Sequence, residues 1–392
     1  MLGSIIGDIV GSVYEFANIK TKEFEFFNER GSFTDDSVLT VATADWLLNG
    51  GNVAHYYARY GAQYRWPMGG YGSNFQLWLA RANRRGDYRP YNSCGNGSAM
   101  RVGPVGWAFD TKEEVMQKAA ESAACTHNHP EGIRGAQATA LAIFLARTGG
   151  SKDDIRAAIE QEIGYDLSFT CDEIRPTYTW GGLCQTSVPQ AIVAFLDGND
   201  FEDCIRNAIS IGGDSDTIGC ITGSIAEAFY GIPNHLRRRA VSYLPAEMRH
   251  TVAEFEQKYQ QQEADDRRIT PHHIRQLAPG EVFVFGSNAQ GYHGGGAART
   301  AMDKFGAVWG QGEGLQGSSY AIPTMEGRSR MAVAIGRFID FASAHPDLHF
   351  LVTPIGCGIA GYRFVDVAPL VRPATALSNV SLPAEFWDVL QL

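Results

Sequence analysis

Apolar residues recur at helical spacing through most of the first 258 residues. One such stretch reads "DDSVLTVATADWLL", in which Val38, Ala42 and Trp46 share one helical face. Another reads "PEGIRGAQATALAIFLAR" and begins at Pro130, a residue that suits the first turn of a helix. Strand-like alternation is scarce here. The pattern therefore predicts an all-α domain over residues 1–258.

The chain opens with glycines at four-residue steps. Gly3, Gly7 and Gly11 would share one face of a helix predicted to run through "IIGDIVGSVYEF", and that bare face would allow close packing. The opening also carries Asp8 and Glu15 and no basic leader, so it does not resemble a signal peptide. Apolar runs throughout the sequence are too short to span a membrane, and we expect a cytoplasmic protein.

The pattern changes near residue 259, where a polar, glutamine-rich stretch predicts a linker over residues 259–272. After it, "EVFVFGSN" predicts a buried strand, and "GGGAARTAMDKF" predicts a glycine loop that leads into a helix. A second helix follows in "MAVAIGRFIDFASAH", and "HFLVTPIGCGIAGY" predicts a strand that enters another glycine loop. The alternation predicts a smaller α/β domain over residues 273–392.

Composition narrows the classes of ligand. The net charge is −10, which argues against nucleic-acid binding through bulk electrostatics but leaves room for a small anion held by backbone amides. The seven cysteines form no C-x-x-C pair, so we expect reduced thiols, without structural zinc or a disulfide framework.

Two segments of the helical region, "SFTDDSVL" and "GGDSDTIGC", repeat the same chemistry just before predicted helices. Carboxylate and hydroxyl oxygens suit Mg²⁺, Mn²⁺ or Ca²⁺ better than zinc. If the segments meet, their repulsion favours a pair of divalent ions about 3.5–4 Å apart that could hold a nucleophilic water. The alternative is ordinary helix capping, which suits Asp and Thr at a helix start. The candidate ligands are Thr34, Asp35, Asp36, Asp214, Asp216 and Thr217.

Five motifs, in this order and spacing, resemble the ADP-ribosylglycohydrolases, which include the dinitrogenase reductase-activating glycohydrolase. They are "IIGDIVGSVYEF", "FTDDSVL", "CGNGSAMRVGPVGW", "THNHPEGIRGAQATALAI" and "GGDSDTIGCITGSIAEAFYGI". The resemblance covers roughly residues 1–250. It implies an all-α fold, two Mg²⁺ or Mn²⁺ ions held by the six candidate ligands, and hydrolysis of the bond between ADP-ribose and an acceptor.

The resemblance also assigns roles to other residues. It implies that Glu15 and Asp35 act in catalysis, although a solvated glutamate at a helix end would explain Glu15 equally simply. His127 would contact the substrate, and the glycine loop before it would hold the diphosphate through its amides. A plain turn is the alternative for that loop, and the side chain of Met100 also suits the core. The implied substrate-binding residues are Gly95, Asn96, Gly97, Ser98, Met100 and His127.

The two glycine loops of the second domain each follow a predicted strand, an arrangement typical of phosphate-bearing ligands. Neither loop matches a P-loop, which argues against an ATPase. With its "GGGAA" and "IGCGIAG" segments, the region resembles a divergent macro domain, which implies ADP-ribose binding. Structural turns on an inert scaffold are the alternative. The implied ligand contacts are Asn288, His293, Gly295, Gly296, Gly356, Gly358 and Tyr362.

Three functions follow as hypotheses. The leading one is a metal-dependent hydrolase that removes ADP-ribose from a protein, with a macro-like module that binds ADP-ribose. The second is a non-catalytic sensor of ADP-ribose or a nucleotide, in which metals only order the site. The third is a hydrolase of free metabolites such as ADP-ribosylated small molecules or nucleobases.

Overall fold

The computed structural model describes residues 1–260 and 268–390. The chain divides into two compact units, Met1–Ala240 with Leu244–Ala264, and Val241–Tyr243 with Asp265–Leu392. Half of the predicted linker over residues 259–272, namely 261–267, lies outside the described residues. Of its described part, Tyr259 and Gln260 close a short π-helix. The amide of Thr270, by contrast, donates to the carbonyl of Leu382 (2.9 Å), so this end of the segment belongs to the second unit.

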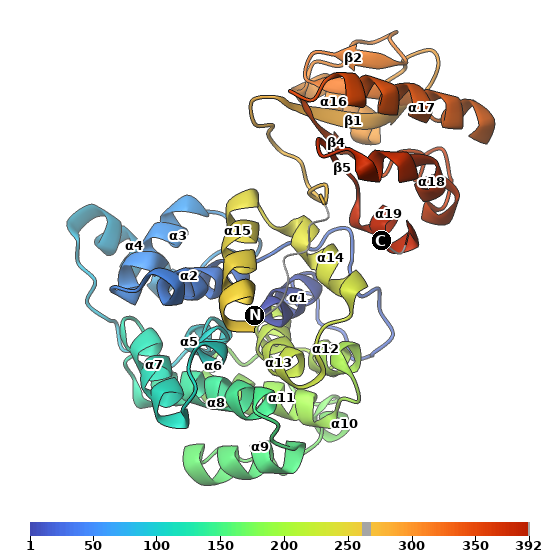
Figure 1. The fold of residues 1–392 in the computed structure, drawn as a ribbon. Coiled ribbons are helices and arrows are strands. Elements are labelled where there is room, and N and C mark those ends of the chain that lie inside the picture. The colour runs from blue at the N-terminus through green and yellow to red at the C-terminus, as the bar shows by residue number, and fades with distance from the viewer. Residues whose placement is uncertain (261–267, 391–392) are drawn as a thin grey trace. The chain divides into compact units, whose positions relative to one another are not determined.

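In its described part, the first unit is built from helices (Figure 1). They confirm the helical pattern read from the sequence, although the first helix ends at Gly11 and leaves Glu15 in the loop beyond it. The helices are α1 (Leu2–Gly11), α2 (Asp35–Asn49), α3 (Val53–Gln63), α4 (Ser73–Arg85), α5 (Gly97–Met100), α6 (Val105–Ala108), α7 (Lys112–Ala124), α8 (Pro130–Arg147), α9 (Lys152–Ala158), η1 (Ile159–Ile163), α10 (Cys171–Ile174), α11 (Cys184–Asp197), α12 (Phe201–Ser210), α13 (Ser215–Tyr230), α14 (Asn234–Tyr243), α15 (Ala246–Phe255) and η2 (Glu256–Gln260).

The second unit is an α/β structure with a five-stranded sheet in the order β2-β3-β1-β4-β5. Strand β1 is central and runs parallel to both β3 and β4, and only β2 is antiparallel to its neighbour. The elements are β1 (Glu281–Ser287), α16 (Gly296–Lys304), β2 (Gly314–Gln316), β3 (Ser319–Pro323), α17 (Arg328–Ala344), β4 (His349–Val352), α18 (Phe364–Val371), η3 (Arg372–Ala376), β5 (Val380–Ser381) and α19 (Ala384–Leu390).

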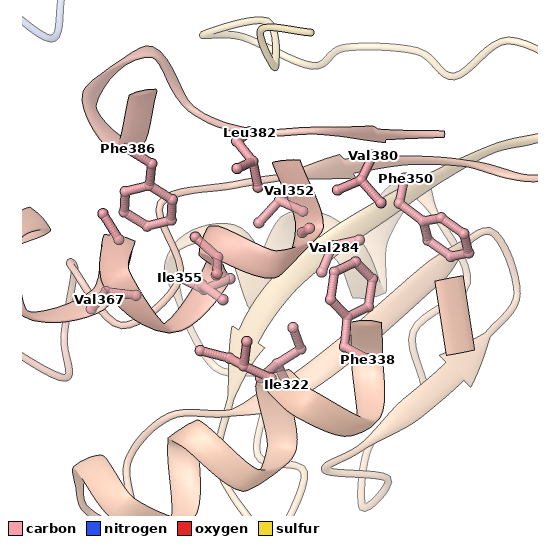
Figure 2. Packing of buried hydrophobic residues seen from close by; sticks show 14 of the residues in the cluster. Val284, Ile322, Phe338, Phe350, Val352, Ile355, Val367, Val380, Leu382 and Phe386 are labelled. Atoms are coloured by element: carbon pink, nitrogen blue, oxygen red, sulfur yellow. The ribbon is translucent and has the colours of Figure 1, made fainter. Parts of the chain in front are cut away.

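Side chains of β1 alternate between two hydrophobic cores because successive strand residues face opposite sides of a sheet. Val284 lies beside Phe338 of α17 in the larger core, which extends to Val367 of α18 (Figure 2). Phe283 and Phe285 point to the other face and pack in the smaller core against α16. The sheet is therefore covered on both sides, as parallel sheets require.

Among the helices of residues 1–260 and 268–390, none combines the length and apolar character needed to cross a membrane.

Candidate metal centre and ligand clefts

Two bare helix faces bring distant acidic segments together. Helices α1 and α13 lie side by side (Figure 1), and a Cβ built on Gly7 would lie only 1.9 Å from the carbonyl oxygen of Gly219. A Cβ on Gly11 would lie 2.5 Å from the Cα of Asp216. Only glycine permits this approach, which sets the start of α13 against the end of α1. The glycine face predicted from the sequence is confirmed, and its partner face carries Gly219 and Gly223.

Asp8 holds the start of α2 against the end of α1. Its fully buried carboxylate accepts hydrogen bonds from the amide and hydroxyl of Thr34 (2.9 and 2.6 Å) and from the amide of Ser37 (3.1 Å). The hydroxyl of Ser37 donates to it as well. Sequence reasoning did not select Asp8 for the site. An acidic residue in the middle of a glycine-faced helix was the available signal.

The two acidic segments meet at this junction. The carboxylates of Glu15, Asp214 and Asp216 each place an oxygen within 4.8 Å of the others. Asp36 joins them, because its charge is one of those that raise the pKa of Asp216. One oxygen of Asp36 (Oδ2) and one of Asp216 (Oδ1) are buried without any hydrogen-bond partner among the described residues.

Capping explains only part of this arrangement. The Thr34 hydroxyl accepts a hydrogen bond from the amide of Asp36 (3.1 Å) and caps α2, as the alternative interpretation expects. Asp214 occupies the same position at the start of α13, yet its side chain makes no capping bond. Its Oδ2 instead accepts a hydrogen bond from Asn96 Nδ2 (2.8 Å). The carboxylate is thus turned toward the acidic cluster.

Burial raises the pKa of every carboxyl group in the cluster, and repulsion from neighbouring carboxylates adds to the shift for Glu15, Asp35, Asp36 and Asp216. Burial and then the charges of Asp214 and Asp8 raise the pKa of Glu15 to about 7. Burial raises the pKa of Asp8 to about 6. The pKa values of Asp36 and Asp216 are raised well above the usual range, first by burial and then by neighbouring carboxylates. Asp35 is only partly buried by its neighbours, and its pKa is raised in the same way.

These residues fit a divalent cation. Unpartnered buried carboxylate oxygens are costly, and a cation would compensate both the missing hydrogen bonds and the repulsion. The donors on offer are carboxylate and hydroxyl oxygens, the set that Mg²⁺ and Mn²⁺ prefer.

The loop that carries Glu15 is tied to the loop that precedes α13. Asn18 donates to the carbonyl of Gly213 (2.9 Å) and accepts from its amide (2.9 Å). Gly212 and Gly213 have φ angles of 73° and 79°, a conformation that favours glycine. The two glycines ahead of Asp214 therefore allow the turn that aims its carboxylate, and Asn18 fixes Glu15 beside it.

The glycine loop before α5 is only partly available for a diphosphate. The amide of Gly95 donates to Ser93 Oγ (3.0 Å), and the amide of Asn96 donates to the carbonyl of Gly182 (3.1 Å). Gly97 and Ser98 open α5, where first-turn amides have no acceptor within the helix. If this loop binds a phosphate, the amides of Gly97 and Ser98 are its remaining backbone donors.

Two other residues of the segment are built into the interior. The Ser98 hydroxyl is buried and donates to the carbonyl of Gly132 (2.6 Å). Met100 is 6 % exposed, and its sulfur lies 4.0 Å from the hydroxyl of Thr217. The side chains of Ser98 and Met100 are therefore part of the packed interior around the site, as the core interpretation of Met100 expects.

His127 lies beneath the same loop. Its Nδ1 is 2.8 Å from Thr126 Oγ1, and its Nε2 faces Gly97, lying 3.1 Å from a Cβ built there. Burial and the charge of Arg101 lower the pKa of His127 well below the usual range, so the ring is neutral near pH 7. Sequence reasoning passed over Arg101, which ends the "GNGSAMR" segment and is completely buried.

In the second unit, a cleft of about 490 Å³ opens at the carboxyl ends of the central strands. Its walls come from the loops after β1, β3 and β4, and include Gly295, Gly296, Gly356 and Gly358. Helices α16 and α18, which follow β1 and β4, cover opposite faces of the sheet. The cleft therefore lies where chain connections diverge, the usual ligand position in open α/β sheets.

Of the other three predicted contacts, Asn288 borders the cleft, whereas His293 and Tyr362 are not among its lining residues. His293 is completely buried, stacks edge-on against Phe285 and lies 3.0 Å from Ser287 Oγ. Asn288 borders the cleft, but its amide group bonds both the amide (3.0 Å) and the carbonyl (3.1 Å) of Tyr292 and so braces its own loop. Tyr362 packs against the larger core and is absent from the residues that line the cleft.

Comparison with known proteins identifies the family to which this chain belongs. The sequence profile of the ADP-ribosylglycohydrolase family matches residues 1–268. The chain therefore belongs to this family, and it is a hydrolase that acts on linkages of ADP-ribose.

Relatives from animals and bacteria agree with this. The chain is 26 % identical over 309 residues to the ADP-ribosylhydrolase ARH3 of Bos taurus, an alignment that covers 59 % of this chain and 84 % of ARH3. It is 26 % identical over 270 residues to the ADP-ribosylarginine hydrolase Tri1 of Pseudomonas putida (strain GB-1), covering 59 % and 70 %. A solved "ADP-ribosylglycohydrolase-related protein complex" matches with a TM-score of 0.52 and 23 % identity, over 65 % of this chain and 95 % of that one, which supports the fold.

Proposed function

We propose that the first unit is a metal-dependent hydrolase that cleaves the glycosidic bond between ADP-ribose and an acceptor, and that the second unit binds ADP-ribose as a macro-like module. The observation that carries the proposal is the convergence of Glu15, Asp214 and Asp216, together with buried oxygens of Asp36 and Asp216 that have no hydrogen-bond partner among the described residues. We propose two Mg²⁺ or Mn²⁺ ions as occupants. When bound, such ions polarise water and ribose hydroxyls.

The six ligands proposed from the sequence divide into two arms held by separate contacts. Asp8 fixes the arm of Thr34, Asp35 and Asp36 through its bonds to the start of α2. Asn96 fixes the other arm through its bond to Asp214. The contacts made by Asp8 and Asn96 hold the carboxylates close together despite their repulsion. The cation site would therefore be preorganised in the metal-free protein.

The reaction transfers water to the anomeric carbon and returns a proton to the departing acceptor. Glu15 would handle that proton, because it is only partly buried and its pKa is raised to about 7. Asp35, the other proposed catalytic residue, is partly exposed at the start of α2, and the charge of Glu15 acts on it. The neutral His127 and the amides of Gly97 and Ser98 would contact the substrate.

The proposal for the second unit is binding without catalysis. The side chains that line its cleft, among the described residues, include neither carboxylate, imidazole, amine nor thiol, and the phenol of Tyr292 is the sole titratable group. Hydrolysis of a glycosidic bond calls for acid or base groups, which this cleft lacks. Backbone amides at Gly295, Gly296, Gly356 and Gly358 remain to hold a phosphate.

The test is release of ADP-ribose from arginine-, serine- and carboxylate-linked peptides and from free conjugates, in EDTA and after addition of Mg²⁺ or Mn²⁺. We expect metal-dependent release by the full chain and at least about a hundredfold lower kcat for Glu15→Gln, the range of one general acid or base. The matched control is Glu113→Gln, an exposed glutamate in the first turn of α7. ADP-ribose binding with no release from any conjugate would favour the sensor hypothesis, and the conjugate cleaved fastest identifies the acceptor.

A further inference from the structure

Arg101 is a fully buried cation with few partners. Its guanidinium lies 3.9 Å over the ring of Tyr57. Nη2 donates to the carbonyl of Ser122 (2.9 Å) and to Thr126 Oγ1 (2.7 Å). Its Nε and Nη1 have no acceptor within the described part of the chain, and no carboxylate there pairs with it.

The titratable groups that interact with this charge do not neutralise it. Burial raises the pKa of the two tyrosines and the two cysteines that sense it, so all four are uncharged near pH 7. The fifth group, a histidine, has a lowered pKa and is neutral as well. These groups are Tyr57, Tyr91, Cys125, Cys184 and His127. A buried charge without a counter-ion is costly, so its retention calls for an anion that is not part of the chain.

A hydrogen-bond chain leads from the guanidinium to the glycine loop. Arg101 can only donate, so Thr126 Oγ1 accepts from it, and the hydroxyl hydrogen is then available to His127 Nδ1, 2.8 Å away. Nδ1 as acceptor leaves the proton of the neutral ring on Nε2. Nε2 faces Gly97, at 3.1 Å from a Cβ built there, and Gly95, at 3.7 Å from one. The Nε2–H of His127 therefore points at the same segment as the amides of Gly97 and Ser98, which have no acceptor within α5.

We propose that Arg101 is a positioning residue for the phosphate group of the substrate: through Thr126 it fixes His127 as an Nε2–H donor, and its charge is balanced by the bound phosphate. The inference rests on the proposed function, since it takes ADP-ribose as the ligand of the first unit. The anion is bound by the His127 Nε2–H and the amides of Gly97 and Ser98, while the cation acts from beneath through a region of low dielectric.

The first test separates the relay from simple packing. Thr126→Val keeps the shape of the side chain and the charge of Arg101 but removes the hydroxyl, whereas Thr126→Ser restores it. We expect the KM of Thr126→Val to rise about tenfold at nearly constant kcat, and Thr126→Ser to remain within about twofold of the wild type. Nitrogen-15 spectra of His127 should show a proton on Nε2 in the wild type and in Thr126→Ser. A proton on Nδ1 in the wild type overturns the relay.

The second test concerns the charge. Inhibition constants for ADP-ribose and for adenosine, which lacks phosphate, are measured against the same hydrolysed conjugate in wild type, Arg101→Lys and Arg101→Met. Only the first unit is proposed to hydrolyse, so binding to the second does not enter. We expect Arg101→Met to weaken ADP-ribose about tenfold or more while adenosine changes little, since one charge-assisted contact is lost. Equal weakening of both ligands overturns the proposal and indicates a structural role.

The outcomes remain distinguishable from failure of the proposed function. A wild type that hydrolyses no conjugate contradicts the proposed function, and the His127 spectrum then decides the inference alone: it should shift with ADP-ribose and not with adenosine. If Arg101→Met does not fold, Thr126→Val and Thr126→Ser carry the test, because both keep the buried cation.

Discussion

The two candidate ligand sites of this chain differ in their chemical composition. The first unit concentrates carboxylates from three segments, and burial raises the pKa values of all of them. The cleft of the second unit is lined by glycine backbone and uncharged side chains. A charged cluster can activate water and move protons, whereas an uncharged cleft can only select and hold. Comparison of the two sites therefore separates chemistry from recognition within a single chain.

The largest loss of activity is expected from a change in the carboxylate cluster itself, at Asp214. Asp214→Asn should lower kcat by at least about a thousandfold, because one ligand of the proposed metal centre is lost and turnover would depend on its geometry. ADP-ribose binding to the second unit, followed by calorimetry on the full chain, should be unchanged. Asp110→Asn is the matched control, since its side chain is fully exposed. Full activity in Asp214→Asn would remove the metal assignment.

The next effect concerns the packing that assembles the charged site. Gly7→Ala should destabilise the first unit by about 2–4 kcal/mol, because its Cβ would collide with the backbone of Gly219 and force α1 and α13 apart. Hydrogen exchange should quicken in α1 and α13 while the amides of β1 keep their protection. Gly336→Ala is the control, because nothing lies within 4 Å of a Cβ there. Uniform loss of protection in both units would show that the two share one unfolding transition.

A smaller effect tests the uncharged cleft. Gly358 lines that cleft and has open space around a Cβ. Gly358→Leu should keep the fold yet weaken ADP-ribose binding in the second unit by about tenfold or more, since the side chain occupies ligand volume. Titration calorimetry should then report one strong site in place of two. Gly336→Leu, a helical position with equal space, is the control. A loss of hydrolysis of free conjugates in Gly358→Leu would contradict a binding-only role.

The smallest effect is a pH dependence confined to the charged site. Raised carboxyl pKa values mean that the folded, metal-free first unit holds protons that the unfolded chain has already lost. The contribution of Asp8 and Glu15 to its stability is therefore largest below about pH 4 and is lost as pH rises through about 6 to 7. In EDTA, the melting temperature of the first unit should drop by several degrees between pH 5 and 8. Mg²⁺ should reverse the trend, because binding requires deprotonated carboxylates. An unchanged melting curve in EDTA would contradict a preassembled acidic cluster.

The sequence predicted those elements whose pattern is contained in a short stretch of the chain. Helical spacing identified α2, α8 and α13, and the β-branched run before "GSN" identified β1. It did not find the short strands β2 and β5, whose two or three residues are too few to show a period. It also extended the first helix across Glu15, because apolar spacing continues past Gly11 while the chain turns away.

The sequence by itself determined which candidate groups exist: two acidic segments with matching hydroxyls, three glycine loops and a glycine-faced first helix. It determined these because residue type and short spacing carry that chemistry directly. Only the tertiary structure decided that Asp8 and Asn96 hold the acidic arms, that His293 is buried away from the cleft, and that Arg101 has no carboxylate partner in the described part of the chain. Those properties depend on burial and on contacts between residues far apart in the chain, which no local pattern records.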